Sequence, residues 1–324
     1  MPSPSEPRPL YVIALILLTL SSTLQAAAPN VLVSIKPIHS LVAGVMTGVG
    51  EPKLLIGGSD SPHSFTLRPS TARKLNNAEL IFWVGESLES PLESILSMVN
   101  GRVVELLTVE GIEIAPPRKA VAWEQRNEDE TSDSDHAHNN DKALNHAHLQ
   151  GNPHIWLSPL NGLAIVMLIE RELSTIDPDN ATHYRENAIN LRQRIRQLDK
   201  KLGKRLSAVR EQPYIVFHDA YQAFEDHYRL NSIGSVALNT DRMPGAKHIH
   251  QLRKRIDTQG VRCLFSEPQF KPKLVHTLVD GTRARSGELD PLGSDLVPGP
   301  DAYFQLMHNL AEALVGCLGP EGKN

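Results

Sequence analysis

Short apolar runs that alternate with segments of helical spacing constrain the fold of this chain more than any other feature. From residue 29 onward each run is three to five residues long, and most are followed by a turn and a helical stretch. Such alternation is typical of α/β folds, in which helices connect the strands. The pattern predicts strands at residues 31–35, 80–84, 103–106, 155–157, 214–217, 233–236, 263–265 and 286–289.

Residues 179–210 predict one much longer helix. Asp177 is suited to cap this helix and Pro178 to occupy its first turn. About 30 residues at 1.5 Å each give a length on the order of 45 Å, enough for a rigid strut between two lobes. A coiled-coil dimerisation helix is the alternative interpretation. The apolar residues recur at spacings of three and four, as in an amphipathic helix: Tyr184, Ala188, Leu191, Ile195, Leu198, Leu202 and Leu206.

The long helix divides the chain into two α/β lobes. We predict an N-terminal lobe at residues 29–177, a linker helix at 178–211 and a C-terminal lobe at 212–324. With 324 residues, 40% of them hydrophobic, the chain is long enough for each lobe to bury its own core.

Residues 1–28 have the pattern of a secretory signal peptide. Residues 11–20 form an apolar run, and small residues follow it at Ala26 and Ala28. The run is too short to span a bilayer comfortably, so a membrane anchor is the less favoured interpretation. We expect the chain to be exported, with cleavage near Ala28.

The net charge and the motif content exclude several classes of function. The formal net charge is −4, without the basic surplus of a nucleic-acid-binding protein. No phosphate-binding loop, nucleophile elbow or cysteine-rich zinc motif is present in the sequence. Cys263 and Cys317 are the two cysteines, and in an exported chain we predict a disulfide between them. Free buried thiols are the alternative.

A polar, acidic segment at residues 123–152 interrupts the α/β pattern. It has too few apolar residues to fold alone, which predicts a surface loop. Two His-x-His pairs with carboxylates nearby favour weak, multidentate Zn²⁺ binding over an inert linker. The histidines of this auxiliary loop are His136, His138, His146 and His148.

Three further histidines stand at positions where α/β folds place ligands. His218 ends a predicted strand, His154 begins one, and His63 lies in a turn-rich loop. Three imidazoles with an open fourth position make a tetrahedral Zn²⁺ site. Spacing does not group them, because they are far apart in the sequence, and a structural role for each one alone remains open.

Eight short motifs follow one another along residues 31–317. They are SIKP at residues 34–37, LRPS at 67–70, WVG at 83–85, HIWLSP at 154–159, VFHDAY at 216–221, PG at 244–245, EPQF at 267–270 and LDPLG at 289–293. With these motifs the chain resembles the periplasmic metal-binding proteins of high-affinity zinc ABC transporters, within the wider zinc and manganese solute-binding group. The motifs occur in the same order as in that family, which makes the resemblance specific.

The resemblance implies two α/β lobes joined by one long helix, with a metal held in the cleft between them. His63, His154 and His218 match the three zinc-binding histidines of the family, and His218 stands where manganese-binding relatives have glutamate. Asp290 matches a carboxylate ligand of those relatives. The implied role is capture of Zn²⁺ and its delivery to a membrane permease by a monomer that is not an enzyme. Cys263 and Cys317 match the disulfide of the family.

The chain departs from some zinc-binding members at Pro62, where they carry an acidic residue before the first histidine. The fourth metal position then falls to water or to Asp290. Asp219, Glu267 and Asp290 are candidates to orient a ligand imidazole, although a plain salt bridge is the alternative for Glu267. A zinc-dependent hydrolase that uses the three histidines, with Asp219 as general base, is the competing function.

Overall fold

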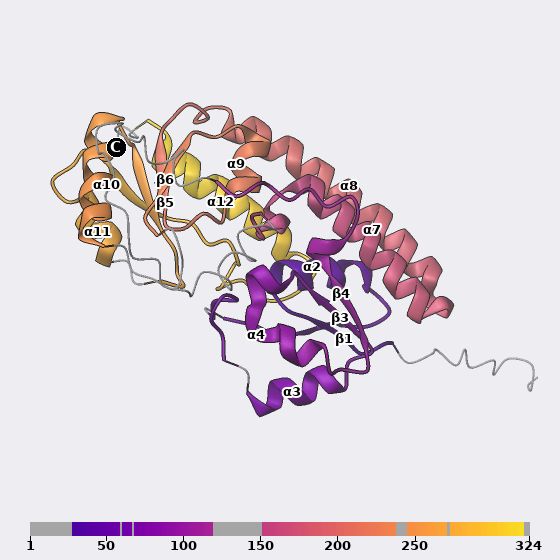
Figure 1. Ribbon diagram of the computed structural model, residues 1–324. Coiled ribbons are helices and arrows are strands. Elements are labelled where there is room, and N and C mark those ends of the chain that lie inside the picture. The colour runs from indigo at the N-terminus through magenta and orange to yellow at the C-terminus, as the bar shows by residue number, and fades with distance from the viewer. Residues whose placement is uncertain are drawn as a thin grey trace, which may run out of the picture.

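The computed structural model of the protein describes residues 28–58, 60–66, 68–118, 151–237, 245–270 and 273–320. Two four-stranded sheets lie on opposite sides of the molecule, and all of their strand pairs are parallel (Figure 1). The first sheet has the order β2-β1-β3-β4 and contains β1 (Val31–Val33), β2 (Lys53–Leu54), β3 (Leu80–Trp83) and β4 (Arg102–Glu105). The second has the order β6-β5-β7-β8 and contains β5 (Tyr214–Val216), β6 (Ser232–Ser235), β7 (Cys263–Ser266) and β8 (Arg285–Glu288).

Both sheets have the same strand order, which places a switch point in each. The second strand of each sheet adds on one side of the first strand, and the later strands add on the other side. The order therefore reverses between β1 and β3 and between β5 and β7. Loops that leave such a point diverge and form a crevice in which α/β proteins bind ligands. Lys36 follows β1, His218 follows β5 and Glu267 follows β7.

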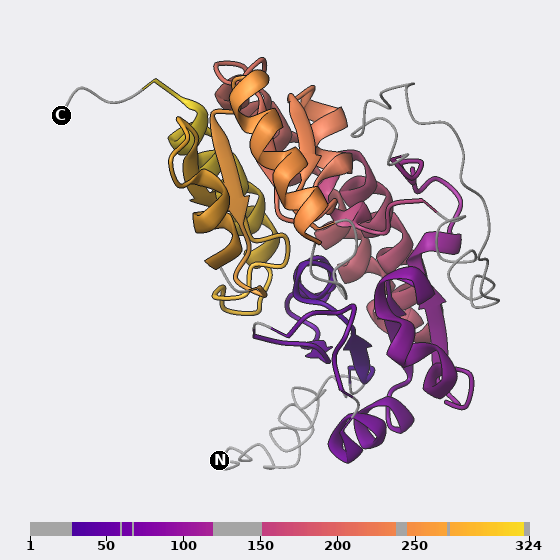
Figure 2. The ribbon, with the colours of Figure 1, turned by 60° about the vertical axis from the view of Figure 1, so that its left-hand side comes forward.

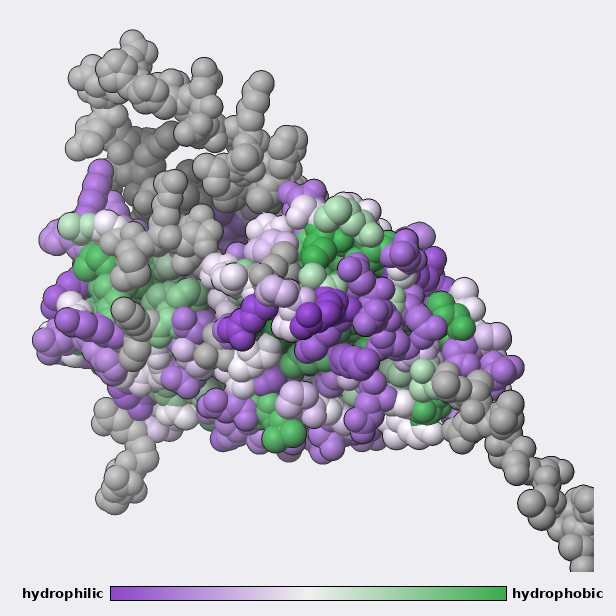
Figure 3. All heavy atoms as spheres, turned by 90° about the horizontal axis from the view of Figure 1, so that it is seen from below, coloured by the Kyte–Doolittle hydropathy of each residue, from purple (hydrophilic) through white to green (hydrophobic). Residues whose placement is uncertain are grey.

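Helices enclose the sheets and leave the central strands buried. Strands β1, β3, β5 and β7 are buried along their whole length, as expected for parallel strands that are covered on both faces. On the face shown in Figure 3, hydrophobic residues lie in separate small patches among hydrophilic ones. The helices are α2 (Lys36–Val45), α3 (Pro69–Asn76), α4 (Glu86–Leu96), α7 (Pro159–Ile176), α8 (Ala181–Leu206), α9 (Gln222–Tyr228), α10 (Ala246–Thr258), α11 (Lys273–Val279) and α12 (Ala302–Leu318).

The long helix is present as α8, which begins two residues later than predicted. It has 26 residues, about 39 Å at 1.5 Å each. Asp177 ends α7, and Pro178–Asn180 form a separate 3₁₀ turn before α8. The Asp177 carboxylate accepts hydrogen bonds from Asn180 Nδ2 and from Tyr184 Oη, so it fixes the corner rather than capping α8. The apolar stripe of α8 packs within the chain, against α7, α2 and α12.

Helix α12 runs from the first lobe back to the second sheet (Figure 2). It packs against β8 at one side and against α2 and α8 at the other. Ser40 Oγ accepts a hydrogen bond from the Tyr303 backbone N–H, which ties the start of α12 to α2. Two elements, α8 and α12, therefore connect the lobes. The lobe boundaries at residues 177 and 212 remain predictions.

One predicted strand is absent, and one strand of the structure was not predicted. Residues Ile155–Leu157 form a 3₁₀ turn, not a strand. Their side chains are fully buried where the chain enters α7, so the apolar run reflects tertiary burial rather than strand pairing. Strand β2 was not predicted; it has only two residues, and neither is fully buried.

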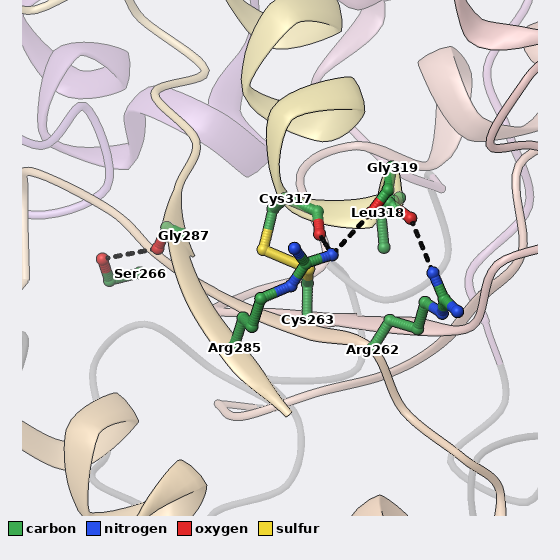
Figure 4. Close-up of a disulfide and its surroundings, with 8 residues drawn as sticks. All are labelled: Arg262, Cys263, Ser266, Arg285, Gly287, Cys317, Leu318 and Gly319. Carbon is green, nitrogen blue, oxygen red and sulfur yellow. Dashed lines mark hydrogen bonds between the residues drawn. A yellow bond between two sulfur atoms is a disulfide. The ribbon is translucent and has the colours of Figure 1, made fainter. Parts of the chain in front are cut away.

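The predicted disulfide is confirmed, and it joins β7 to the last turn of α12 (Figure 4). Cys263 and Cys317 are its two residues. Arg285 donates hydrogen bonds to the backbone carbonyls of Cys317 and Gly319, and Arg262 donates one to that of Leu318. These cations lie where a helix leaves its last carbonyls without partners and where positive charge is favoured. The second lobe therefore holds α12 by covalent and polar contacts.

Two predicted segments lie outside the described residues. The signal peptide, apart from Ala28, is one, and most of the His-rich loop is the other. Within the described residues, no helix has the length and apolar character needed to cross a membrane.

A buried carboxyl group supports the corner between β3 and α4. Glu89 is fully buried and its Oε2 accepts hydrogen bonds from the backbone N–H groups of Val84 and Gly85, at 2.8 and 3.0 Å. Helix α4 is kinked at Glu89, just before Pro91. Burial raises the pKa of Glu89 to about 7, although these hydrogen bonds and one from Ser34 oppose the shift. The folded chain therefore binds a proton at Glu89 that the unfolded chain releases at lower pH.

We expect Glu89→Gln to remove part of the pH dependence of stability. A carboxyl pKa that is raised on folding makes the free energy of unfolding fall as the pH rises, between the unfolded value of about 4.5 and the folded value of about 7. Denaturant unfolding across pH 4–8 should show a smaller fall for Glu89→Gln than for the wild type. Glu93→Gln, an exposed change on the same helix, is the control. Parallel pH curves for all three proteins would contradict the assignment.

Candidate functional site: a three-histidine centre between the lobes

The three predicted histidines meet between the two sheets. One ligand nitrogen from each of His63, His154 and His218 lies within 4.8 Å of the other two. His63 comes from the loop between β2 and α3, His154 from the turn before α7, and His218 from the end of β5. The ring centroids are 5.1 to 5.8 Å apart. Residues separated by 91 and 64 positions in sequence thus form one cluster.

The orientation of the His154 ring is fixed by Asn152. The ring Nδ1 lies 2.8 Å from Asn152 Oδ1, which also accepts the His154 backbone N–H. Asn152 Nδ2 donates to the backbone carbonyl of Asp219 and to Gln222 Oε1. One amide therefore ties the His154 segment to the chain that follows His218.

The orientation of the His218 ring is fixed by Glu267. The ring Nδ1 lies 2.7 Å from Glu267 Oε1, and both side chains are almost fully buried. Glu267 follows β7, the strand that pairs with β5, so the sheet itself places this carboxylate beside the ring. A carboxylate that accepts from Nδ1–H fixes the ring tautomer and makes the other nitrogen a stronger ligand.

These two hydrogen bonds determine which nitrogens face the cleft as acceptors. An amide oxygen and an ionised carboxylate only accept, so Nδ1 carries the hydrogen in both rings. The Nε2 atoms of His154 and His218 lie 3.3 Å apart, and in the neutral rings that bind metal both present lone pairs to each other. A tetrahedral Zn²⁺ with Zn–N bonds of about 2.0–2.1 Å holds its ligand nitrogens about 3.3–3.4 Å apart. The spacing fits a shared cation.

The third histidine completes the lining of a small cavity. His63 Nε2 is buried and has no hydrogen-bond partner among the described residues. Burial, with a contribution from His218, lowers the pKa of His63 to about 3 and holds that of His154 well below its usual value. Neutral imidazole is the form that binds metal. The cavity has a volume of about 10 Å³ and is lined by the three histidines with Ser61, Pro62, Glu267, Gln269, Phe270, Pro291 and Leu292.

Asp290 lies near this cavity, but hydrogen bonds engage both of its carboxylate oxygens. Oδ1 accepts from Gln269 Nε2 and from the Leu292 N–H, each at 3.0 Å, and Oδ2 accepts from the Ser294 N–H at 2.5 Å. It does not belong to the group of side chains that could hold one metal ion. As arranged, Asp290 organises its own loop.

Asp219, beside His218, faces a cation instead of the cavity. Its Oδ1 lies 3.1 Å from Arg118 Nη1, and Arg118 also bonds Glu225 at 2.6 Å. Burial raises the pKa of Asp219 to about 6, although Arg118 opposes the shift. Arg118, which precedes the His-rich loop, and Asn152, its last residue, both contact Asp219, next to His218. His136, His138, His146 and His148 lie outside the described residues.

One orienting residue was missed by the sequence analysis. Asn152 was included in the acidic loop because of its polar neighbours, yet it is buried and bonded to His154. Its place two residues before a candidate ligand, separated by a proline, was the available signal.

Comparison with known proteins identifies the family of this chain. The model of the family described as "Zinc-uptake complex component A periplasmic" matches residues 31–317. The chain belongs to this family. It is 39% identical over 313 residues to the "High-affinity zinc uptake system protein ZnuA" of Brucella abortus, and the match covers 92% of this chain and 94% of that protein.

Solved structures of the family share the fold. A "Crystal structure of ZnuA" has a TM-score of 0.74 at 22% identity, covering 90% of this chain and 100% of that one. The "138-173 ZnuA deletion mutant plus zinc bound" has a TM-score of 0.72 at 22% identity, covering 91% and 99%. The predicted architecture of two α/β lobes is therefore confirmed.

We expect Glu267→Gln to weaken zinc binding. The change keeps the shape of the side chain and removes the negative charge that strengthens His218 as a ligand. Loss of such a partner typically costs about 10- to 100-fold in metal affinity. Competition with a chromophoric chelator measures the constant. Glu312→Gln makes the same change at an exposed pair with Arg205 and serves as the control; equal affinities for the two variants would contradict the role of Glu267.

Proposed function

We propose that this protein captures Zn²⁺ in the periplasm and delivers it to the membrane permease of a high-affinity zinc ABC transporter. The observation that carries the proposal is the 3.3 Å distance between the Nε2 atoms of His154 and His218, with the buried Nε2 of His63 beside them, which has no hydrogen-bond partner among the described residues. Family membership and the zinc uptake named for its relatives support the same role. In this role Zn²⁺ is cargo, and the lobes hold it until the permease is reached.

The donor set favours zinc over manganese. Three neutral imidazoles suit Zn²⁺, whereas Mn²⁺ prefers oxygen ligands. The carboxylate that could supply oxygen, Asp290, is engaged by its own loop. We assign the fourth position to water in the closed protein.

The remaining features of the proposal concern location and chemistry. We propose cleavage of the signal peptide near Ala28 and action as a monomer in the periplasm, where family members operate. Hydrolysis would need a general base free to act on metal-bound water. Asp219 pairs with Arg118, which favours binding and delivery over catalysis.

Titration of the metal-free mature protein tests the site. We expect one tight Zn²⁺ equivalent and much weaker Mn²⁺ binding. Each of His63→Ala, His154→Ala and His218→Ala removes a ligand, so each should cost more than the roughly 10- to 100-fold expected from losing an outer partner. His276→Ala, an exposed histidine on α11, is the matched control and should bind like the wild type. Tight binding that survives all three ligand changes would refute the assignment.

The His-rich loop should supply additional, weaker capacity. Deletion of residues 123–150 is expected to remove weak Zn²⁺ equivalents and to leave the single tight one. Isothermal titration of the deletion variant beside the wild type measures both classes. A full-length variant with serine at His136, His138, His146 and His148 separates loss of the histidines from loss of the segment. If the tight class disappears with these histidines, the primary site lies in the loop.

A further inference from the structure

A buried lysine connects the two lobes at a place that the metal site does not use. Lys36 is the first residue of α2, directly beyond the switch point of the first sheet. Its Nζ donates hydrogen bonds to the backbone carbonyls of Gly293 and Ser294, each at 2.6 Å. Those carbonyls belong to the loop after β8 in the other lobe. Lys36 is only 5% exposed, so the contact is enclosed by both lobes.

Asp290 gives this loop the shape that receives the ammonium group. Its carboxylate accepts the N–H groups of Leu292 and Ser294, and Gly293 between them has φ +65°, a conformation that favours glycine. The amides therefore point inward to Asp290, while the carbonyls of Gly293 and Ser294 point outward to Lys36. We call residues 290–294 the lysine seat.

The lysine seat is continuous with the metal cavity. Pro291 and Leu292 line that cavity, and the Pro291 carbonyl accepts a hydrogen bond from Trp156 Nε1 at 2.8 Å. The Trp156 ring lies 5.2 Å from the ring of the ligand His154. One loop of the second lobe thus accepts hydrogen bonds from Lys36 and Trp156, and the same loop lines the metal cavity.

The charges around Lys36 indicate a reversible contact. Burial lowers the pKa of Lys36, and the nearby carboxylates of Asp290 and Asp295 oppose that shift. An ammonium group has three donors, and two carbonyl acceptors replace only part of its water. When the lobes separate, water hydrates the ammonium group again. This hydration offsets much of the free energy that the contact gains when the lobes close, so the contact can break and re-form.

We propose that Lys36 is a positioning residue that holds the two lobes closed over the bound metal and thereby sets the rate of metal release. The inference rests on the proposed function. Lys36 acts through the lysine seat and not through the ligands. Its loss leaves the three imidazoles in place but lets the lobes part more often.

Metal-release kinetics test this role. Lys36→Met keeps the length of the side chain and removes the charge and the donors. Hydrogen bonds of charged groups contribute strongly to a contact, so we expect the variant to release Zn²⁺ to excess chelator roughly 10- to 100-fold faster. The rate of Zn²⁺ association should change little. The tetrahedral absorption bands of the Co²⁺-substituted protein should match those of the wild type. Lys53→Met, the same change at an exposed lysine of the same lobe, should release like the wild type.

A second variant changes the same contact at the residue that supports it in the other lobe. Asp290→Ala removes the anchor of the lysine seat and should also accelerate release. Because both changes break one contact, the double variant should release no faster than the faster single variant. Equal release by wild type and Lys36→Met, additive effects in the double variant, or altered Co²⁺ bands in Lys36→Met would each overturn the proposal. Absence of tight Zn²⁺ binding by the wild type would instead refute the proposed function itself.

Discussion

Two ring nitrogens that face each other as acceptors are the constraint on which this structure depends. Asn152 and Glu267 each accept the Nδ1–H of a ligand histidine, and in the neutral rings that bind metal the Nε2 lone pairs of His154 and His218 face each other at 3.3 Å. Without a cation such a pair is repulsive and buried, which a fold tolerates only with a compensating partner. The polar groups around the cleft therefore have a common purpose, because they prepare neutral imidazoles to share one metal ion.

The α/β framework explains how distant residues reach this point. Each parallel sheet has a switch point, and Lys36, His218 and Glu267 follow the central strands that form these points. The other parts of the site come from elsewhere in the chain: His63 follows β2, His154 precedes α7, and the lysine seat follows β8. Helices α8 and α12 both connect the lobes. The ligands come from both lobes, so a bound metal would hold the lobes together.

The sequence predicts the strands and helices of this protein better than it predicts which residues contact one another in the folded chain. Apolar runs mark most of the strands, since parallel strands buried on both faces have no polar alternation to obscure them. The run at Ile155–Leu157 was misread because burial at a lobe interface leaves the same signal as burial in a sheet. His63, His154 and His218 could be grouped only through resemblance to a family, because periodicity says nothing about contacts across many residues. The orienting bond of Asn152 is likewise tertiary and has no local pattern.

X-ray absorption at the zinc edge, on the full mature protein loaded with one equivalent of Zn²⁺, tests the central claim most directly. The account predicts three imidazole nitrogens at about 2.0–2.1 Å and one oxygen that completes a tetrahedron. It also predicts that the imidazole signal falls by one ligand in His218→Ala. A spectrum with fewer than three imidazoles in the wild type, or one unchanged by His218→Ala, would contradict the three-histidine centre.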